Sequence, residues 1–169
     1  NGRVPVVVLD YLGNWLTPEM IAVITHRYAQ DGSRGTFDLY HPVDPGPAVP
    51  TALEFPADLR LAGYHLVPSP GRPAYHGGET VLLTLDWSEE TGNSRQKAGD
   101  GNVDVVVQVN DRQGRRLLET SRPLLYGVLP PSSWGDATIQ HMQPIVLPPE
   151  LPPGAYQIAI TLRASERDL

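Results

Sequence analysis

The chain has 169 residues, of which 40% are hydrophobic and 19% charged, and its formal net charge is -6. This length and composition are typical of a globular protein with one well-buried core. The 13 basic residues are scattered, whereas a nucleic-acid surface needs clustered Lys and Arg. No apolar run approaches the roughly 20 residues that cross a bilayer.

Cysteine is absent, which excludes disulfides, thiolate metal sites and cysteine nucleophiles. The absence fits a cytosolic protein and an extracytoplasmic one equally, so the compartment stays open. The chain starts at Asn1 without a signal-like apolar segment, and a strand-like pattern begins at Val4. We therefore expect a fragment of a longer polypeptide, although processing also produces such a start.

Residues 1–57 are predicted to form a small β-α-β unit with a proline-rich connection. A β-branched run over residues 4–10 is typical of a covered strand. Thr17-Pro18-Glu19 has the residue types of a helix start, and an apolar stripe continues to Tyr28 before Gly32. Residues 36–40 return to a strand pattern. The intervening helix favours parallel pairing of the two strands.

Residues 58–169 are predicted to form an antiparallel β-sandwich of jelly-roll or immunoglobulin-like type. Several strands with one apolar face each can bury those faces only by packing two sheets together. A change of apolar parity at Ala62-Gly63 predicts a β-bulge, and Gly114 predicts a tight turn. The prolines between Leu147 and Gly154 predict an extended crossing between the sheets or across one end of them. Strands are expected over residues 59–67, 80–87, 103–110, 115–120, 138–147 and 155–163.

No residue pattern in this sequence predicts catalysis, a metal site or a cofactor. Asp100 to Asp104 has the spacing that opens a calcium loop, but Val105 follows where an EF-hand needs Gly, so a polar turn is favoured. The five histidines show no zinc-binding spacing and are expected at the surface or rim. Asp86 near Glu89-Glu90 is interpreted as part of an exposed acidic loop, because no second carboxylate can be placed opposite it.

Aromatic side chains are the candidate ligand-binding residues. Trp87, Tyr126 and Trp134 fall at strand ends or in loops, where flat exposed rings can stack on sugars. The competing interpretation is packing, in which Trp87 caps the core and Trp134 holds a long loop in place, and it is the favoured one.

A set of motifs in residues 59–163 resembles the C-terminal extracytoplasmic β-sandwich of bacterial family 39-like membrane glycosyltransferases, which are related to protein mannosyltransferases. Two features depart from that pattern: the loop after Trp87 is longer, and Gly135 follows Trp134 directly. The matching motifs are Leu61-x-Gly63-Tyr64, Gly78-Glu79-Thr80, Thr84-Leu85-x-Trp87, Val107-x-Val109-x-Asp111-x-x-Gly114, Pro123, Trp134, Leu147-Pro148 and Leu151-Pro152-Pro153-Gly154-x-Tyr156.

The resemblance implies a non-catalytic accessory domain on the extracytoplasmic face of a bacterial membrane. Its partners would be the membrane portion of the same polypeptide, which carries the catalytic acid in that family, and a glycan or acceptor. Nucleic acid is not expected as a partner. The alternative is a carbohydrate- or protein-binding module of a secreted or surface protein. An independent hydrolase has only scattered carboxylates in its favour.

Overall fold

The protein is mainly β. A computed structural model describes residues 7–10, 24, 28–34, 37–42, 48–56, 58–67, 74–89, 103–127, 131, 134 and 137–164. Within these ranges, helix is limited to the short 3-10 element η1 (Leu124–Gly127) and to single positions at Ile24 and Pro131. All the strand pairs in the described part of the chain are antiparallel.

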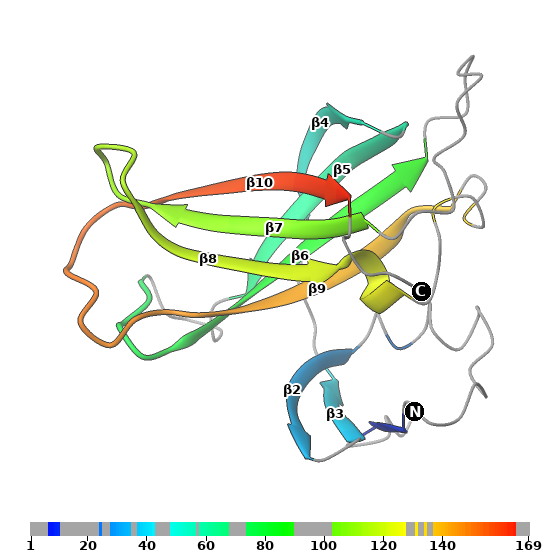
Figure 1. Cartoon of the computed structure of the whole chain (residues 1–169), viewed down its shortest axis with the longest axis horizontal. Coiled ribbons are helices and arrows are strands. Elements are labelled where there is room, and N and C mark those ends of the chain that lie inside the picture. The colour runs from blue at the N-terminus through cyan, green and yellow to red at the C-terminus, as the bar shows by residue number, and fades with distance from the viewer. Residues whose placement is uncertain are drawn as a thin grey trace.

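Seven strands form the two larger sheets, which lie one in front of the other in Figure 1. One sheet has the order β4-β5-β6-β9 and the other β10-β7-β8. Each strand predicted from residue 59 onward is present, within three residues of its expected bounds. The strands are β4 (Val49–Phe55), β5 (Leu59–Val67), β6 (Thr80–Glu89), β7 (Val103–Asn110), β8 (Arg116–Pro123), β9 (Ile139–Val146) and β10 (Gln157–Ala164).

The two larger sheets share one hydrophobic core. Leu85 and Trp87 of β6 are fully buried, and they belong to the same cluster as Val105 and Val107 of β7. Since β6 and β7 lie in different sheets, the apolar faces of the sheets are buried against each other. The strand orders differ from the ABED and CFG orders of immunoglobulin constant domains.

The predicted bulge in β5 is confirmed. Leu61 pairs with Trp87 and Gly63 with Asp86, so Ala62 is the extra residue. On one side of it Leu61 is buried in the core, and on the other Tyr64 and Leu66 pack against the same core.

The N-terminal strands form a small third sheet, seen below the other two in Figure 1. The order is β1 (Val7–Asp10), β3 (Phe37–Pro42), β2 (Tyr28–Arg34). The expected parallel pairing of the first and last strands is wrong, because β3 pairs antiparallel with β1. The strand β2 occupies residues expected at the end of a helix, and it forms a hairpin with β3. Both β1 and β2 run antiparallel to β3, so they are parallel to each other without being neighbours.

The rest of the predicted β-α-β unit is only partly covered by the described residues. Ile24 is helical, as expected, but residues 11–23 and 25–27 lie outside the described part. The helix therefore stays a prediction, as does the division into residues 1–57 and 58–169. The four-stranded sheet begins at Val49, because β4 pairs with β5.

Two connections behave as the sequence indicated. The proline-rich segment joins β9 of one sheet to β10 of the other, so it crosses between the sheets. The turn between β7 and β8 contains Gly114 at a φ of 77°. Asp111 organises this turn by accepting hydrogen bonds from the backbone N–H groups of Arg115 and Gln113, both at 2.9 Å. The bond from Arg115 is the main cause of the lowered pKa of Asp111.

Buried polar side chains connect β9 to η1 and to β8 of the facing sheet. The imidazole Nδ1 of His141 accepts a hydrogen bond from the backbone N–H of Leu125 at 3.1 Å. The amide of Gln143 donates to Thr120 Oγ1 of β8 at 2.6 Å. His141 is fully buried, so the expectation that the histidines lie at the surface or rim is wrong for this residue. Its strand register places it inside, which its spacing along the sequence could not show.

Burial of His141 predicts a pH-dependent stability. Burial lowers the pKa of its imidazole to about 4, from 6.5 in the unfolded chain. Between these values the unfolded state binds a proton that the folded state does not. The stabilisation is therefore complete above about pH 6.5 and falls as the pH drops toward 4, by roughly 3 kcal/mol for this group.

Urea denaturation between pH 7 and pH 4 measures this loss. The variant His141→Gln is expected to be less stable at pH 7 but to lose less stability on acidification than the wild-type chain. Equal slopes of unfolding free energy against pH in the two proteins would show that His141 does not titrate in this way.

Candidate ligand pocket

A pocket of about 520 Å³ lies at one end of the two larger sheets. This is the end at the left of Figure 1, where the β7–β8 turn and the β9–β10 connection are found. We call it the end pocket. Its apolar wall residues are Leu66, Val81, Val109, Ile145, Leu147, Leu151 and Ile158, and its other lining residues are Ala74, Tyr75, His76, Gly77, Pro152, Pro153, Gly154 and Tyr156.

The walls are the ends of strands whose middles form the core. Val81 lies at the start of β6, Val109 near the end of β7 and Ile145 near the end of β9. All three are buried and belong to the core cluster. The pocket is therefore continuous with the hydrophobic core, at the end where the core side chains stop and two loops begin.

Two chain segments are held together at the mouth of the end pocket. The backbone N–H of Gly78 donates to the carbonyl of Leu147 at 3.0 Å, and the N–H of Leu147 donates to the carbonyl of Glu79 at 2.9 Å. At Gly77, a Cβ would come within 2.3 Å of the Pro149 carbonyl oxygen. Glycine is therefore required at position 77 for the segments to approach this closely.

The chemistry of the lining is apolar. Burial raises the pKa of the Tyr75 hydroxyl above its ordinary value. The hydroxyl of Tyr156 donates to the carbonyl of Pro152 within the proline-rich segment. His76 is exposed, and its backbone N–H donates to the Glu79 carboxylate at 3.1 Å. Such a lining can enclose an apolar group, but it presents no nucleophile beside a general base.

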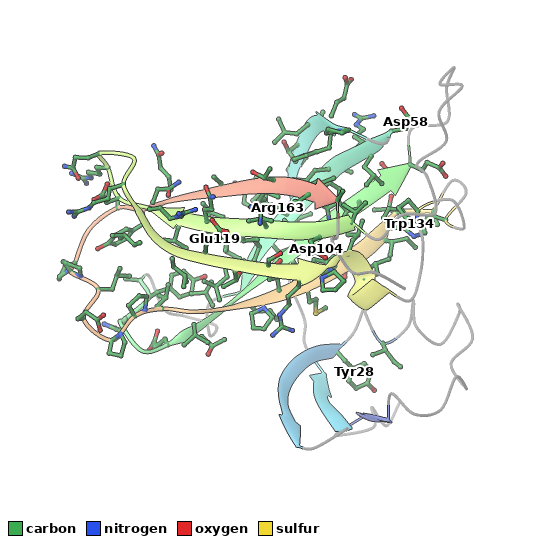
Figure 2. The ribbon with its side chains drawn as sticks, viewed as in Figure 1. Tyr28, Asp58, Asp104, Glu119, Trp134 and Arg163 are labelled. Carbon is green, nitrogen blue, oxygen red and sulfur yellow. The ribbon has the colours of Figure 1, made fainter. Side chains whose placement is uncertain are left out.

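Two of the three residues predicted to bind a ligand, Trp87 and Trp134, do not line the end pocket. Trp87 is 0% exposed and Trp134 5%, so neither indole offers a ring face for stacking in this structure. Their burial supports the packing interpretation. Figure 2 shows Trp134 at the end of the sheets away from the β7–β8 turn. The side chain of Tyr126 lies outside the described part, so its role stays a prediction.

The other sequence candidates also have definite positions. Asp86 is 9% exposed and lies within β6, so the expectation of an exposed acidic loop is wrong for this residue. Asp104 lies in β7 and accepts a hydrogen bond from Ser121 at 3.4 Å, while residues 100–102 lie outside the described part. Within the described ranges, no group of three or more His, Cys, Asp or Glu residues could hold a metal ion.

Sequence reasoning missed most of the end pocket. It singled out the prolines between Leu147 and Gly154, but the wall residues have the same alternating pattern as the core residues beside them. Only the register of the strands shows which apolar residues lie beyond the filled core. A local signal was present in the loop glycines next to Tyr75 and in the prolines after Leu147.

Comparison of the chain with protein-family models, curated proteins and solved structures gives no match. Among the described residues, no helix has the length and apolar character needed to cross a membrane.

Substitution of Gly77 tests the closure of the pocket mouth. We expect Gly77→Ala to lower the unfolding free energy by about 1–3 kcal/mol, because the added methyl meets backbone atoms that cannot move independently. Urea denaturation followed by circular dichroism measures the change. The matched control is Gly154→Ala, whose Cβ would meet no atom closer than 3.7 Å. Equal effects of the two substitutions would contradict the close approach at Gly77.

Proposed function

We propose that this chain is a non-catalytic accessory domain that binds an apolar group of a ligand or acceptor in the end pocket. The observation that carries the proposal is a pocket of about 520 Å³ with apolar walls. Pockets of roughly 300–1,000 Å³ with mostly apolar linings are the usual sites for small ligands in proteins.

The lining favours an apolar acceptor group over a bare glycan. A sugar needs several hydrogen-bond partners around its hydroxyls as well as an aromatic face. Two tyrosines and His76 are the polar side chains of the described lining, and the Tyr156 hydroxyl is already bonded to Pro152. A glycan would then contact the rim of the pocket, while the pocket itself would enclose the apolar group of the ligand.

The family resemblance supports a parent protein of a particular kind. Several motifs shared with the sandwich of family 39-like glycosyltransferases fall at this pocket: Gly78-Glu79, Val109, Leu147-Pro148 and the segment from Leu151 to Tyr156. We infer a two-sheet sandwich of the broad jelly-roll or immunoglobulin-like architecture, with a strand order of its own, on the extracytoplasmic face of a bacterial membrane. The membrane portion of the same polypeptide would be its partner and would carry catalysis.

Binding of a neutral apolar probe tests the pocket. N-phenylnaphthylamine is expected to show a saturable rise in fluorescence with the wild-type chain. Ala74→Trp fills the mouth from an exposed lining position, and it should weaken binding by at least about tenfold. Ala52→Trp, at an exposed position on β4 outside the pocket, is the control and should bind like wild type. No saturable rise, or equal loss in both variants, would contradict the proposal.

The parent coding sequence tests the membrane assignment separately. If the chain belongs to a membrane glycosyltransferase, the sequence upstream of Asn1 should encode several apolar runs of about 18 residues or more. A parent without such runs would rule out this assignment. It would leave the pocket as the site of a secreted or surface binding module.

A further inference from the structure

Strand β10 is an open edge of the three-stranded sheet. It pairs with β7 without a bulge over residues 157–164, and within the described ranges its extensive contacts are with β7 alone. Proline and charged side chains commonly protect an edge strand from pairing with another chain. The other edge strands of the two larger sheets each contain a proline: Pro50 in β4, Pro123 in β8 and Pro144 in β9. In contrast, β10 has no proline, and Arg163 is its one charged residue.

The three-stranded sheet is one strand narrower than the sheet it faces. The hydrogen bond from Gln143 to Thr120 places β9 opposite β8. Since the two strand orders are β9-β6-β5-β4 and β8-β7-β10, β6 then lies opposite β7 and β5 opposite β10. Leu66 of β5 and Ile158 of β10 accordingly line the same pocket. No strand of the described part remains to lie opposite β4, which extends above β10 in Figure 1.

Two large apolar side chains on the core-facing side of β4 are exposed. Val49 is directly opposite Tyr64, and Leu53 is directly opposite Leu61. Directly opposite residues of an antiparallel pair share a face, and both partners on β5 pack in or against the core. Val49 and Leu53 are nevertheless 48% and 53% exposed, as expected where the facing sheet has ended. We call the backbone edge of β10, together with these two side chains, the open edge.

The geometry of the open edge favours a single extended strand over a second copy of this chain. A second copy could pair its β10 here with its apolar side toward β4. Its own β5 would then lie beneath that β10, because β5 and β10 lie opposite each other. That position is already occupied by β4 of the first copy. An extended segment brings no second sheet with it, so β4 does not obstruct its pairing.

Charge on β10 indicates one side chain of the incoming strand. Ile160 and Leu162 pack against the core, so Arg163 points to the opposite side of the sheet. Its side chain is 58% exposed, and the nearest Glu119 carboxylate oxygen is 3.8 Å from its guanidinium. Arg163 therefore has donors left for a second carboxylate. An acidic residue directly opposite Arg163 is favoured, and a basic residue there is disfavoured.

We propose that the open edge binds an extended peptide segment of a partner protein, which becomes the fourth strand of the three-stranded sheet. Its main chain pairs antiparallel with β10, its apolar side chains at every second position cover Val49 and Leu53, and an acidic side chain lies opposite Arg163. In this mode of recognition, main-chain hydrogen bonds supply affinity and alternate side chains supply specificity. The proposal is independent of the end pocket, because neither Val49 nor Leu53 lines that pocket.

An NMR titration of the full chain with a synthetic peptide tests the proposal. The probe is Glu-Ile-Ala-Ile-Thr-Leu-Gln-Ala with both termini blocked, which has the apolar alternation of β10. When its second isoleucine lies opposite Ile160, its glutamate lies opposite Arg163. We expect saturable chemical-shift changes at the backbone amides of residues 157–164 and at the methyl groups of Val49 and Leu53, at peptide concentrations up to about 1 mM.

Two altered peptides separate strand pairing from simple apolar contact. Proline in place of the peptide's alanine and threonine removes two main-chain donors, so this peptide should bind at least about tenfold more weakly. Lysine in place of the glutamate should weaken binding about threefold or more, because it lies opposite Arg163.

Matched variants of the chain make the outcome decisive. Leu53→Lys places a charge at an exposed position of the open edge, so the chain should fold but bind the peptide at least about tenfold more weakly. Val146→Lys replaces an exposed apolar side chain on β9 and should bind like wild type. The proposal is overturned if no saturable shifts appear, or if the proline peptide binds as well as the probe. It is equally overturned if the chain alone sediments as a dimer that Leu53→Lys dissociates, since the open edge would then serve a second copy.

Discussion

Each of the two larger sheets has one apolar face, and these two faces must be buried against each other. The rest of the structure depends on this constraint. Strand β6 is central to that constraint, because Leu85 and Trp87 are fully buried in the same cluster as Val105 and Val107 of the facing sheet. A closely packed core leaves little freedom in how the strands align. The bulge at Ala62 keeps the apolar side chains of β5 directed inward on both sides of it.

The same constraint determines where a ligand site can form. The β9–β10 connection passes from one sheet to the other, and its prolines hold it extended across the end of the core. The loop at Gly77-Gly78 is held against it by backbone hydrogen bonds, so the two segments form a mouth without filling the space behind them. An apolar pocket therefore continues from the core at this end of the two sheets.

Sequence patterns predicted the strands from residue 59 onward because each alternates apolar and polar residues between clear turn signals. A change in the parity of that alternation at Ala62-Gly63 predicted the bulge. They failed at β2, because its residues from Gln30 to Arg34 are polar or glycine and show no apolar alternation. They also failed at the pairing of β1 with β3, which depends on the inserted hairpin. The burial of His65, Asp86 and His141 was also missed, since it depends on which elements cover each sheet face.

A methyl-resolved NMR titration with N-phenylnaphthylamine tests the central claim most directly, namely that the shared core ends in a binding pocket. We expect the largest chemical-shift changes at the methyl groups of Leu66, Val109 and Ile145, which line the pocket from three different strands. Methyl groups of Leu53, exposed on β4, should not shift. Changes confined to Leu53 and other exposed methyl groups, with none at the three pocket residues, would contradict the account.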